Sequence, residues 1–357
     1  MAPLDWGLGH ATRCIPIIKQ LQKSGCTVTV AAQGGIKALL ETEFPGIHII
    51  PLPGYNVQYS ASKRFLPVKI LMQAPKIIRA IRREHTWLQQ QMSLYGFDAV
   101  ISDNRFGLYF PATPSIFITH QLFIQAPYPW LAALIRRINY RYINRFHGCW
   151  VPDFETGNTM AGKLSRPAKL PAVPVTYIGP LSRFDSLAPA LVRYEWMIIL
   201  SGPEPQRTIL EKKLLAVAPK LEGEILLVRG KPGSEEVITA PAKCTVVNHL
   251  ATAQMQEAIA SSNFIVSRCG YTTVMEMLCL GKKCFFIPTP GQTEQEYLAK
   301  HLVQQGWAYY CEQNEQLEAH FYRVKNTFKF NLPPIPGNRS LAETIKNFIK
   351  LLEIRET

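Results

Sequence analysis

Runs of β-branched and aliphatic residues alternate along the chain with stretches whose apolar residues recur every three or four positions. The runs are typical of buried parallel strands, and the stretches are typical of amphipathic helices. Strands are expected at residues 27–31, 48–52, 99–102, 115–119, 149–151, 197–201, 224–229, 244–248, 264–267 and 284–287. Helices are expected at 11–23, 68–93, 131–145, 207–217, 252–260, 272–279, 294–305 and 340–354. The alternation predicts an α/β fold with parallel sheets covered on both faces.

The alternation occurs twice, which predicts two doubly wound, Rossmann-like domains. The Pro- and Gly-containing stretch at 178–181 is the expected joint. It divides the chain into domains at 1–179 and 180–335, and a C-terminal helix within 336–357 is expected to pack back on the first domain. Ligands of such sheets bind beyond the carboxyl ends of the strands, so the loops at those ends carry the candidate chemistry.

Composition excludes several classes of protein. The chain has 357 residues, of which 47 % are hydrophobic and 18 % charged, so it is not a disordered polyelectrolyte. No apolar stretch reaches the roughly 18 residues of a spanning helix, and the N-terminus lacks the pattern of a cleaved secretion signal. The eight cysteines have neither CxxC pairs nor metal-ligand spacing, which predicts reduced thiols in a cytoplasmic protein.

Basic residues are concentrated in the first half. Residues 1–180 hold 19 Lys and Arg against 8 Asp and Glu, whereas residues 181–357 hold 20 against 18. The excess lies at 63–83 and 136–145, where apolar and aromatic residues interleave with the charges. Such stretches bind anionic membrane surfaces, although an ordinary helix with solvated arginines has the same pattern. Nucleic acid is the least supported partner, because no nucleic-acid-binding motif accompanies the charge.

A glycine loop precedes the first expected helix. Gly7 and Gly9 allow a tight turn, and His10 at the helix start can act as a general base near neutral pH. Asp103 follows a strand of the same domain and can orient that imidazole. His120 follows the next strand and offers a second histidine at the same edge. The alternatives are a glycine turn capped by a structural histidine and an Asp that caps the next turn.

The most specific motif is in the second half, where residues 266–276 read Val-Ser-Arg-Cys-Gly-Tyr-Thr-Thr-Val-Met-Glu. A strand ends, Gly270 turns the chain, and Thr272 and Thr273 open a helix. The helix N-terminus suits a diphosphate, and the carboxylate of Glu276 suits the paired hydroxyls of a ribose. A helix N-cap followed by a solvated Glu explains the threonines but not the whole string.

Two other loops also lead from a strand into a helix. Residues 201–207 offer Gly202, a helix N-terminus and the charge of Arg207 to a phosphate, with a structural turn as the alternative. A later loop ends in Glu294 and Gln295, which supply an acceptor and a bidentate amide for sugar hydroxyls.

Together these motifs resemble the MurG-like glycosyltransferases of the GT-B fold, which transfer N-acetylglucosamine from UDP-N-acetylglucosamine to lipid-linked or lipopolysaccharide acceptors. Residues 267–276 are similar to the S-R-x-G-x-x-T-x-x-E nucleotide motif of that family, and residues 294–306 to its D/E/Q-Q-x-x-N-A-x-x-L-x-x-x-G element. Residues 7–10 match its N-terminal glycine loop. The resemblance covers most of residues 1–310 and implies two Rossmann-like domains with a cleft between them.

The resemblance also implies roles for individual residues. The second domain would bind a UDP-sugar, with Glu276 at the ribose, Glu294 and Gln295 at the sugar, and the uracil near His249 and Leu250. The complete expected donor set is Gly202, Arg207, His249, Leu250, Arg268, Gly270, Thr272, Thr273, Glu276, Glu294 and Gln295.

The first domain would bind a lipid-linked or glycan acceptor near Gly7, Gly9 and His120. His10, oriented by Asp103, would be the base of an inverting transfer. Neither a cofactor nor an essential metal is implied, because helix dipoles and basic groups would neutralise the leaving UDP. The expected location is the cytoplasm, on the inner face of the membrane.

Two other functions use the same motifs: a non-catalytic sugar-nucleotide-binding subunit and a nucleotide-sugar epimerase. The donor sugar is also open, because Glu294 stands where N-acetylglucosamine-specific members often carry Gln.

Overall fold

The chain forms two compact units. The computed structural model describes residues 1–5, 7–55, 66–125, 128–184, 187–188, 190–335 and 339–356. The first unit holds Met1–Gln58, Pro67–Arg183 and Pro336–Thr357, and the second is built from Phe184–Ile335. The chain passes between them at Arg183 and Phe184, a few residues beyond the expected joint, and the C-terminal segment belongs to the first unit.

The first unit is built on parallel strands. Its main sheet has the order β3 (Val100–Asp103), β4 (Ser115–Ile118), β5 (Gly148–Val151) and β6 (Val175–Tyr177), and β1 (Thr29–Ala31) pairs separately with β2 (His48–Ile50). The N-terminal residues join the two sheets: Met1 O accepts a hydrogen bond from Ala31 N, and Ala2 O accepts one from Asp103 N, both at 2.9 Å. The strand order reverses between this segment and β3, and doubly wound sheets bind ligands at such a reversal.

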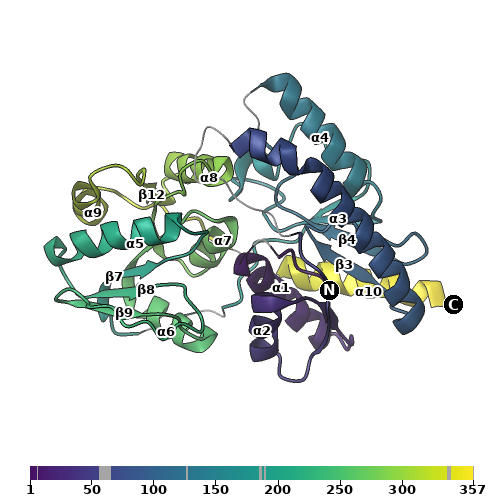
Figure 1. Cartoon of the computed structure of the whole chain (residues 1–357), viewed down its shortest axis with the longest axis horizontal. Coiled ribbons are helices and arrows are strands. Elements are labelled where there is room, and N and C mark those ends of the chain that lie inside the picture. Colours follow the sequence, from purple (N-terminus) through teal and green to yellow (C-terminus); the bar gives the residue numbers. More distant parts are fainter. Residues whose placement is uncertain are drawn as a thin grey trace. The chain divides into compact units, whose positions relative to one another are not determined.

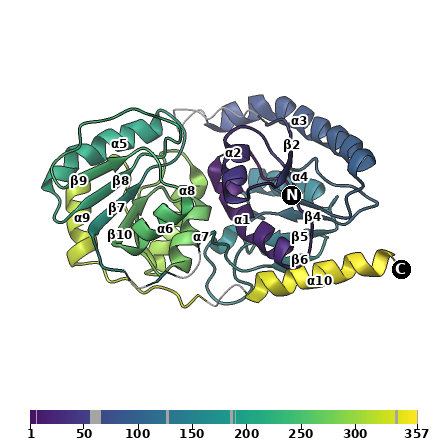
Figure 2. The same cartoon turned by 90° about the horizontal axis from the view of Figure 1, so that it is seen from below.

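Helices flank these strands (Figures 1 and 2). They are α1 (Leu8–Lys23), α2 (Gly34–Glu43), α3 (Leu66–Tyr95), α4 (Pro129–Ile143) and α10 (Arg339–Glu356), with a 3₁₀ turn η2 (Gly162–Leu164). The buried face of α1 carries Cys14, Ile15 and Ile18, which pack against Val30 of β1. Helix α10 contacts α1, and its Phe348 packs edge-on against Trp150 of β5 with the ring centres 5.4 Å apart.

The second unit contains one parallel sheet of six strands. Their order is β12 (Ala308–Tyr310), β11 (Lys283–Phe286), β10 (Ser262–Ser267), β7 (Tyr194–Ile199), β8 (Ile225–Val228) and β9 (Cys244–Val247). The helices are α5 (Gln206–Val217), α6 (Thr252–Ala260), α7 (Tyr271–Cys279), α8 (Thr293–Gln304) and α9 (Leu317–Asn326), with a 3₁₀ turn η3 (Ala218–Lys220). Here the order reverses between β7 and β10, so the loops after these two strands flank the expected ligand position.

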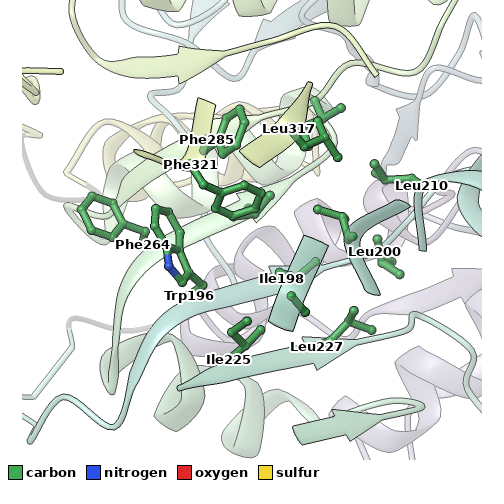
Figure 3. Close-up of a cluster of buried hydrophobic side chains, with 14 of the residues drawn as sticks. Trp196, Ile198, Leu200, Leu210, Ile225, Leu227, Phe264, Phe285, Leu317 and Phe321 are labelled. Atoms are coloured by element: carbon green, nitrogen blue, oxygen red, sulfur yellow. The ribbon is translucent and has the colours of Figure 1, made fainter. Parts of the chain in front are cut away.

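An aromatic cluster holds one face of this sheet (Figure 3). Trp196 of β7 stacks on Phe264 of β10 with the ring centres 4.7 Å apart, and it meets Phe321 of α9 edge-on at 4.8 Å. Phe285 of β11 meets the same Phe321 edge-on at 5.1 Å. Each such buried ring stabilises the unit by about 1.5–3 kcal/mol relative to exposure. The cluster therefore ties the central strands β7 and β10 rigidly to one another below their loops.

Candidate active site

His10 and Asp103 form a hydrogen-bonded pair at the strand reversal of the first unit. His10 lies in the first turn of α1, and Asp103 is the last residue of β3. The His10 Nδ1 and Asp103 Oδ2 atoms are 2.9 Å apart, so the bond expected from the sequence is present. Asp103 is fully buried, whereas the side chain of His10 is 19 % exposed. A ligand can therefore reach the imidazole while the carboxylate stays out of water.

The glycine loop sets the entry to α1. Gly7 is the N-cap residue and has a φ of +132°, a conformation that residues with a side chain rarely adopt. Gly9 lies within the first turn, where its carbonyl accepts a hydrogen bond from Thr12 Oγ1 at 3.0 Å. The sequence thus needs a glycine at position 7 in order to present His10 at the helix start.

Arg13 is a member of this site that sequence reasoning missed. It lies on α1 one turn after His10 and donates from Nε to Asp103 Oδ2 at 3.0 Å and from Nη2 to Asp103 Oδ1. Its Nη1 is 3.2 Å from Nδ1 of His120, which is buried just after β4. The spacing of His10 and Arg13 on one helical face was the available signal.

The neighbouring charges set the protonation of the pair. Burial lowers the pKa of His10 below its ordinary value, Arg13 lowers it further, and Asp103 opposes both. Burial alone would raise the pKa of Asp103, but Arg13 and His10 outweigh it and keep that pKa below its usual value. An ionised Asp103 only accepts hydrogen bonds, so a neutral His10 carries its proton on Nδ1 and a lone pair on Nε2. This is the form that a general base requires.

The N-terminus of α7 follows β10 at the strand reversal of the second unit. Gly270 caps the helix in an extended conformation, with φ −76°, and its carbonyl accepts from Val274 N at 3.0 Å. The first N–H groups of a helix have no partner within it, and the helix dipole adds positive charge at this end. Thr272 and Thr273 are half-buried there, and Glu276 follows in the second turn with 5 % exposure. The residues expected around a diphosphate and a ribose thus lie on the first two turns of one helix.

Arg268 has a different role from the expected donor contact. The side chain is buried, and its Nη1 donates to the carbonyls of Ile287 and Pro288 at 3.0 and 3.1 Å. Its Nη2 donates to Gln206 O at 2.8 Å and to Gln313 Oε1 at 2.6 Å. Burial lowers the pKa of Arg268 to about 10, so the guanidinium stays charged at neutral pH. Arg268 therefore braces the loop after β11 and the start of α5 against the turn after β10.

The structure also corrects the expectation for the loop 201–207. Arg207 is buried and donates from Nε to Glu204 Oε1 at 2.6 Å and from Nη1 to Glu211 Oε2 at 3.3 Å. The second oxygen of Glu204 accepts from Thr208 N at 3.2 Å, at the N-terminus of α5. A carboxylate of the chain itself thus binds one N–H at the start of α5 and pairs with Arg207, the two groups that the sequence offered to a phosphate. Gly202 has a φ of +101°, which residues with a side chain rarely adopt, and so allows the loop to turn here.

The start of α8 also folds onto its own loop. Gln295 Oε1 accepts a hydrogen bond from Thr289 N at 2.8 Å, and Glu296 Oε1 accepts one from Gly291 N at 3.0 Å. The amide nitrogen of Gln295 and the second lone pair of its oxygen are the groups that a sugar could use. Glu294 is half-buried in the first turn of α8, where the helix dipole stabilises its negative charge.

The expected uracil contacts lie at the same edge of the sheet. His249 and Leu250 occupy the loop between β9 and α6, where His249 is exposed and Leu250 is half-buried. Because β8 separates β9 from β7, this loop is further from the strand reversal than the loops after β7 and β10. Among the described residues, no group of three or more His, Cys, Asp and Glu side chains is arranged to hold a metal ion.

Comparison with known proteins shows what the second unit is similar to. Residues 206–336 match the family model described as the glycosyltransferase family 28 C-terminal domain. The match covers most of the second unit. A UDP-N-acetylglucosamine--N-acetylmuramyl-(pentapeptide) pyrophosphoryl-undecaprenol N-acetylglucosamine transferase of Vibrio cholerae is 26 % identical over 319 residues, which is 86 % of this chain and 82 % of the relative. An uncharacterized glycosyltransferase of Methanosarcina acetivorans is 21 % identical over 327 residues, which is 84 % of this chain and 82 % of that one.

Solved glycosyltransferase structures extend the similarity to the whole chain. The glycotransferase of kitacinnamycin has a TM-score of 0.64 at 15 % identity, over 99 % of this chain and 94 % of that one. MurG of Acinetobacter baumannii has a TM-score of 0.55 at 18 % identity, over 99 % and 98 % of the two chains. The chain is thus a glycosyltransferase with the GT-B fold, as the sequence motifs predicted.

Proposed function

We propose that this glycosyltransferase moves N-acetylglucosamine from a UDP-sugar to a lipid-linked or cell-envelope glycan acceptor, with inversion at the anomeric carbon. The observation that carries the proposal is the His10–Asp103 pair, at 2.9 Å, in a chain whose second unit also matches the family 28 model. The name of the Vibrio cholerae relative, which aligns with most of this chain, supports the choice of donor and acceptor.

In this proposal the first unit activates the acceptor. Nε2 of His10 removes the proton from the acceptor hydroxyl as its oxygen attacks the anomeric carbon of the donor sugar. The ionised Asp103 stabilises the imidazolium that forms and holds the ring through Nδ1. A single displacement of this kind inverts the anomeric configuration.

The second unit binds the donor and stabilises the leaving group. The N–H groups at the start of α7 face the diphosphate, and the helix dipole favours the negative charge that grows on UDP. Glu276 binds the ribose hydroxyls, while Glu294 and the amide nitrogen of Gln295 bind the sugar. Arg268 does not contact the donor but keeps the three loops around it in place. The proposal uses no metal ion for charge neutralisation.

Transfer is tested with radiolabelled UDP-N-acetylglucosamine and a bacterial lipid extract, with and without EDTA. We expect label in the butanol-extractable lipid at equal rates in both. Absence of labelled lipid together with intact UDP binding would favour a non-catalytic subunit, and formation of an epimerised UDP-sugar without acceptor would favour an epimerase.

We also propose that α4 docks the first unit on an anionic membrane. Trp130, Leu134 and Ile138 follow one another every four residues and are 66, 48 and 50 % exposed. Tyr128, also exposed, stacks on Trp130 with the ring centres 6.3 Å apart. Arginines at 136, 137, 141 and 145 accompany this stripe. Apolar side chains beside basic ones are the pattern of an interfacial helix.

The other basic stretch, residues 63–83, lies partly within α3. Residues 63–65 lie outside the described part of the chain, as do the side chains of residues 66–74, whereas Arg79, Arg82 and Arg83 of α3 are exposed. No helix in the described part of the chain is long and apolar enough to cross a membrane.

Vesicle binding tests the docking surface. The protein is expected to sediment with phosphatidylglycerol vesicles at low salt and to be released by salt, because the charge attraction is screened. Trp130→Ser with Ile138→Ser should reduce the bound fraction at least threefold. Tyr322 of the second unit is also 66 % exposed, and Tyr322→Ser should leave the bound fraction of protein unchanged. Equal binding by all three proteins would contradict the assignment to α4.

A further inference from the structure

Arg13 connects the polar side chains at the strand reversal of the first unit. Its guanidinium holds both oxygens of Asp103 and reaches Nδ1 of His120. The side-chain amide of Asn104 also takes part: its oxygen accepts a hydrogen bond from Arg13 Nη2 at 3.0 Å, and its nitrogen donates one to Thr119 Oγ1 at 2.9 Å. Asn104 has a φ of +56°, which Asn tolerates better than most residues. The one arginine therefore joins α1 to the loops that follow β3 and β4.

These contacts fix the protons on the two histidines. A guanidinium only donates hydrogen bonds, so Nδ1 of His120 must accept, and the proton of its neutral ring lies on Nε2. The carboxylate of Asp103 only accepts, so His10 must carry its proton on Nδ1. His10 thus contacts the Asp103 end of the Arg13–Asp103 pair and His120 contacts the Arg13 end. The two rings therefore carry their protons on different nitrogens, Nδ1 in His10 and Nε2 in His120.

We infer that Arg13 is a positioning residue that sets opposite tautomers on His10 and His120, and thereby keeps Nε2 of His10 as the proton acceptor. The tautomers follow from the contacts alone, whereas their consequence for catalysis rests on the proposed transfer reaction. Arg13 contributes in two separable ways. Its fork geometry holds Asp103 and His120 at once, and its positive charge disfavours a second positive charge on His10.

The groups that face His10 act on its pKa in opposite directions, and the lowering effects outweigh the raising one. Arg13 and Cys14 come from α1, Asp103 from β3, and His120 from the loop after β4. Burial and Arg13 lower the pKa of His10, His120 adds slightly to this, and Asp103 raises it. Because the pKa is lowered, the neutral base persists below the ordinary pH range of histidine titration. Removing the charge of Arg13 should move the titration of His10 to higher pH.

Nitrogen-15 NMR of histidine-labelled protein tests the inference without substrate. The protonated and unprotonated ring nitrogens have distinct shifts, and His10→Gln and His120→Gln identify the two signals by their loss. In the wild-type protein we expect Nδ1–H on His10 and Nε2–H on His120 at pH 8. The same tautomer on both rings, or the reverse assignment, would overturn the inference whether or not the Arg13 variants fold.

Two variants separate geometry from charge. Arg13→Gln should raise the pKa of His10 by about one unit. The acid limb of the pH–rate profile for transfer should move to higher pH by the same amount. His120 should become a mixture of the two tautomers. Arg13→Lys should keep the titration of His10 near the wild-type value but also release His120, because one ammonium cannot copy the fork. Arg105→Lys alters a buried arginine paired with Glu84 at 2.7 Å and should move neither histidine.

Unchanged histidine signals in both Arg13 variants would refute the role of Arg13. If the predicted signals appear but no transfer is found under any condition, the proposed function fails while the inference about Arg13 stands. If transfer occurs and the acid limb does not move in Arg13→Gln, the link between Arg13 and the base is refuted.

Discussion

Replacing His10 with alanine should lower the rate of sugar transfer by about 10²–10⁴-fold, the usual contribution of a general base. Asp103, Arg13 and the α7 helix stay in place, so donor binding should be unchanged. The measurement is kcat at saturating donor, combined with the shift in melting temperature that UDP causes. His48→Ala removes an exposed histidine from the same unit and should leave kcat unchanged.

A variant without His10 that keeps more than a tenth of the wild-type kcat would remove it as the base. A proportional loss of UDP binding would instead show that the substitution damages the fold beyond the first unit's site.

Replacing Glu276 with alanine should remove most of the stabilisation that UDP gives. Two charge-assisted hydrogen bonds to a ribose contribute about 3 kcal/mol together, so their loss should weaken binding by about 100-fold. At a UDP concentration of about 100 times Kd, wild-type stabilisation is about 2.7 kcal/mol, and it should fall to about 0.4 kcal/mol in the variant. The melting temperature of the protein with and without UDP measures both values.

Because Glu276 is buried, the melting temperature of the unliganded variant must be measured as well. Glu276→Gln keeps the volume of the side chain and should lose most of the UDP effect. Glu257→Ala removes an exposed carboxylate from α6 of the same unit and should keep that effect. A full UDP shift in Glu276→Ala would exclude the ribose assignment.

The fold was accessible from the sequence because its strands are buried on both faces. Such strands appear as short apolar runs, and the expected helices α5, α6, α7 and α8 agree with the structure to within a residue or so at either end. The elements that were missed are β6, β12, α2 and α9. The two strands have three residues each, too few to show a pattern, and α2 begins with two glycines, which usually mark a turn.

The site residues were predicted unevenly because side-chain partners depend on distant contacts. The His10–Asp103 bond followed from the rule that loops gather at the carboxyl edge of a parallel sheet. Arg268 could not be recognised as a brace, since Gln206 and Gln313 are far from it in sequence. The ion pairs of Arg207 could have been predicted from the sequence. Glu204 lies three residues before it and Glu211 four residues after it, which is the spacing of neighbours on a helix.

The most direct test of the central claim, that the second unit binds a UDP-sugar, is a melting-temperature series with UDP-, GDP- and dTDP-sugars at matched concentrations. At about 100 times Kd the correct nucleotide should raise the melting temperature by several degrees, since 1 kcal/mol corresponds to about 2–4 °C for a domain of this size. We expect that rise with UDP-N-acetylglucosamine and a much smaller one with the other nucleotides. No rise with any UDP-sugar at millimolar concentration would contradict the account.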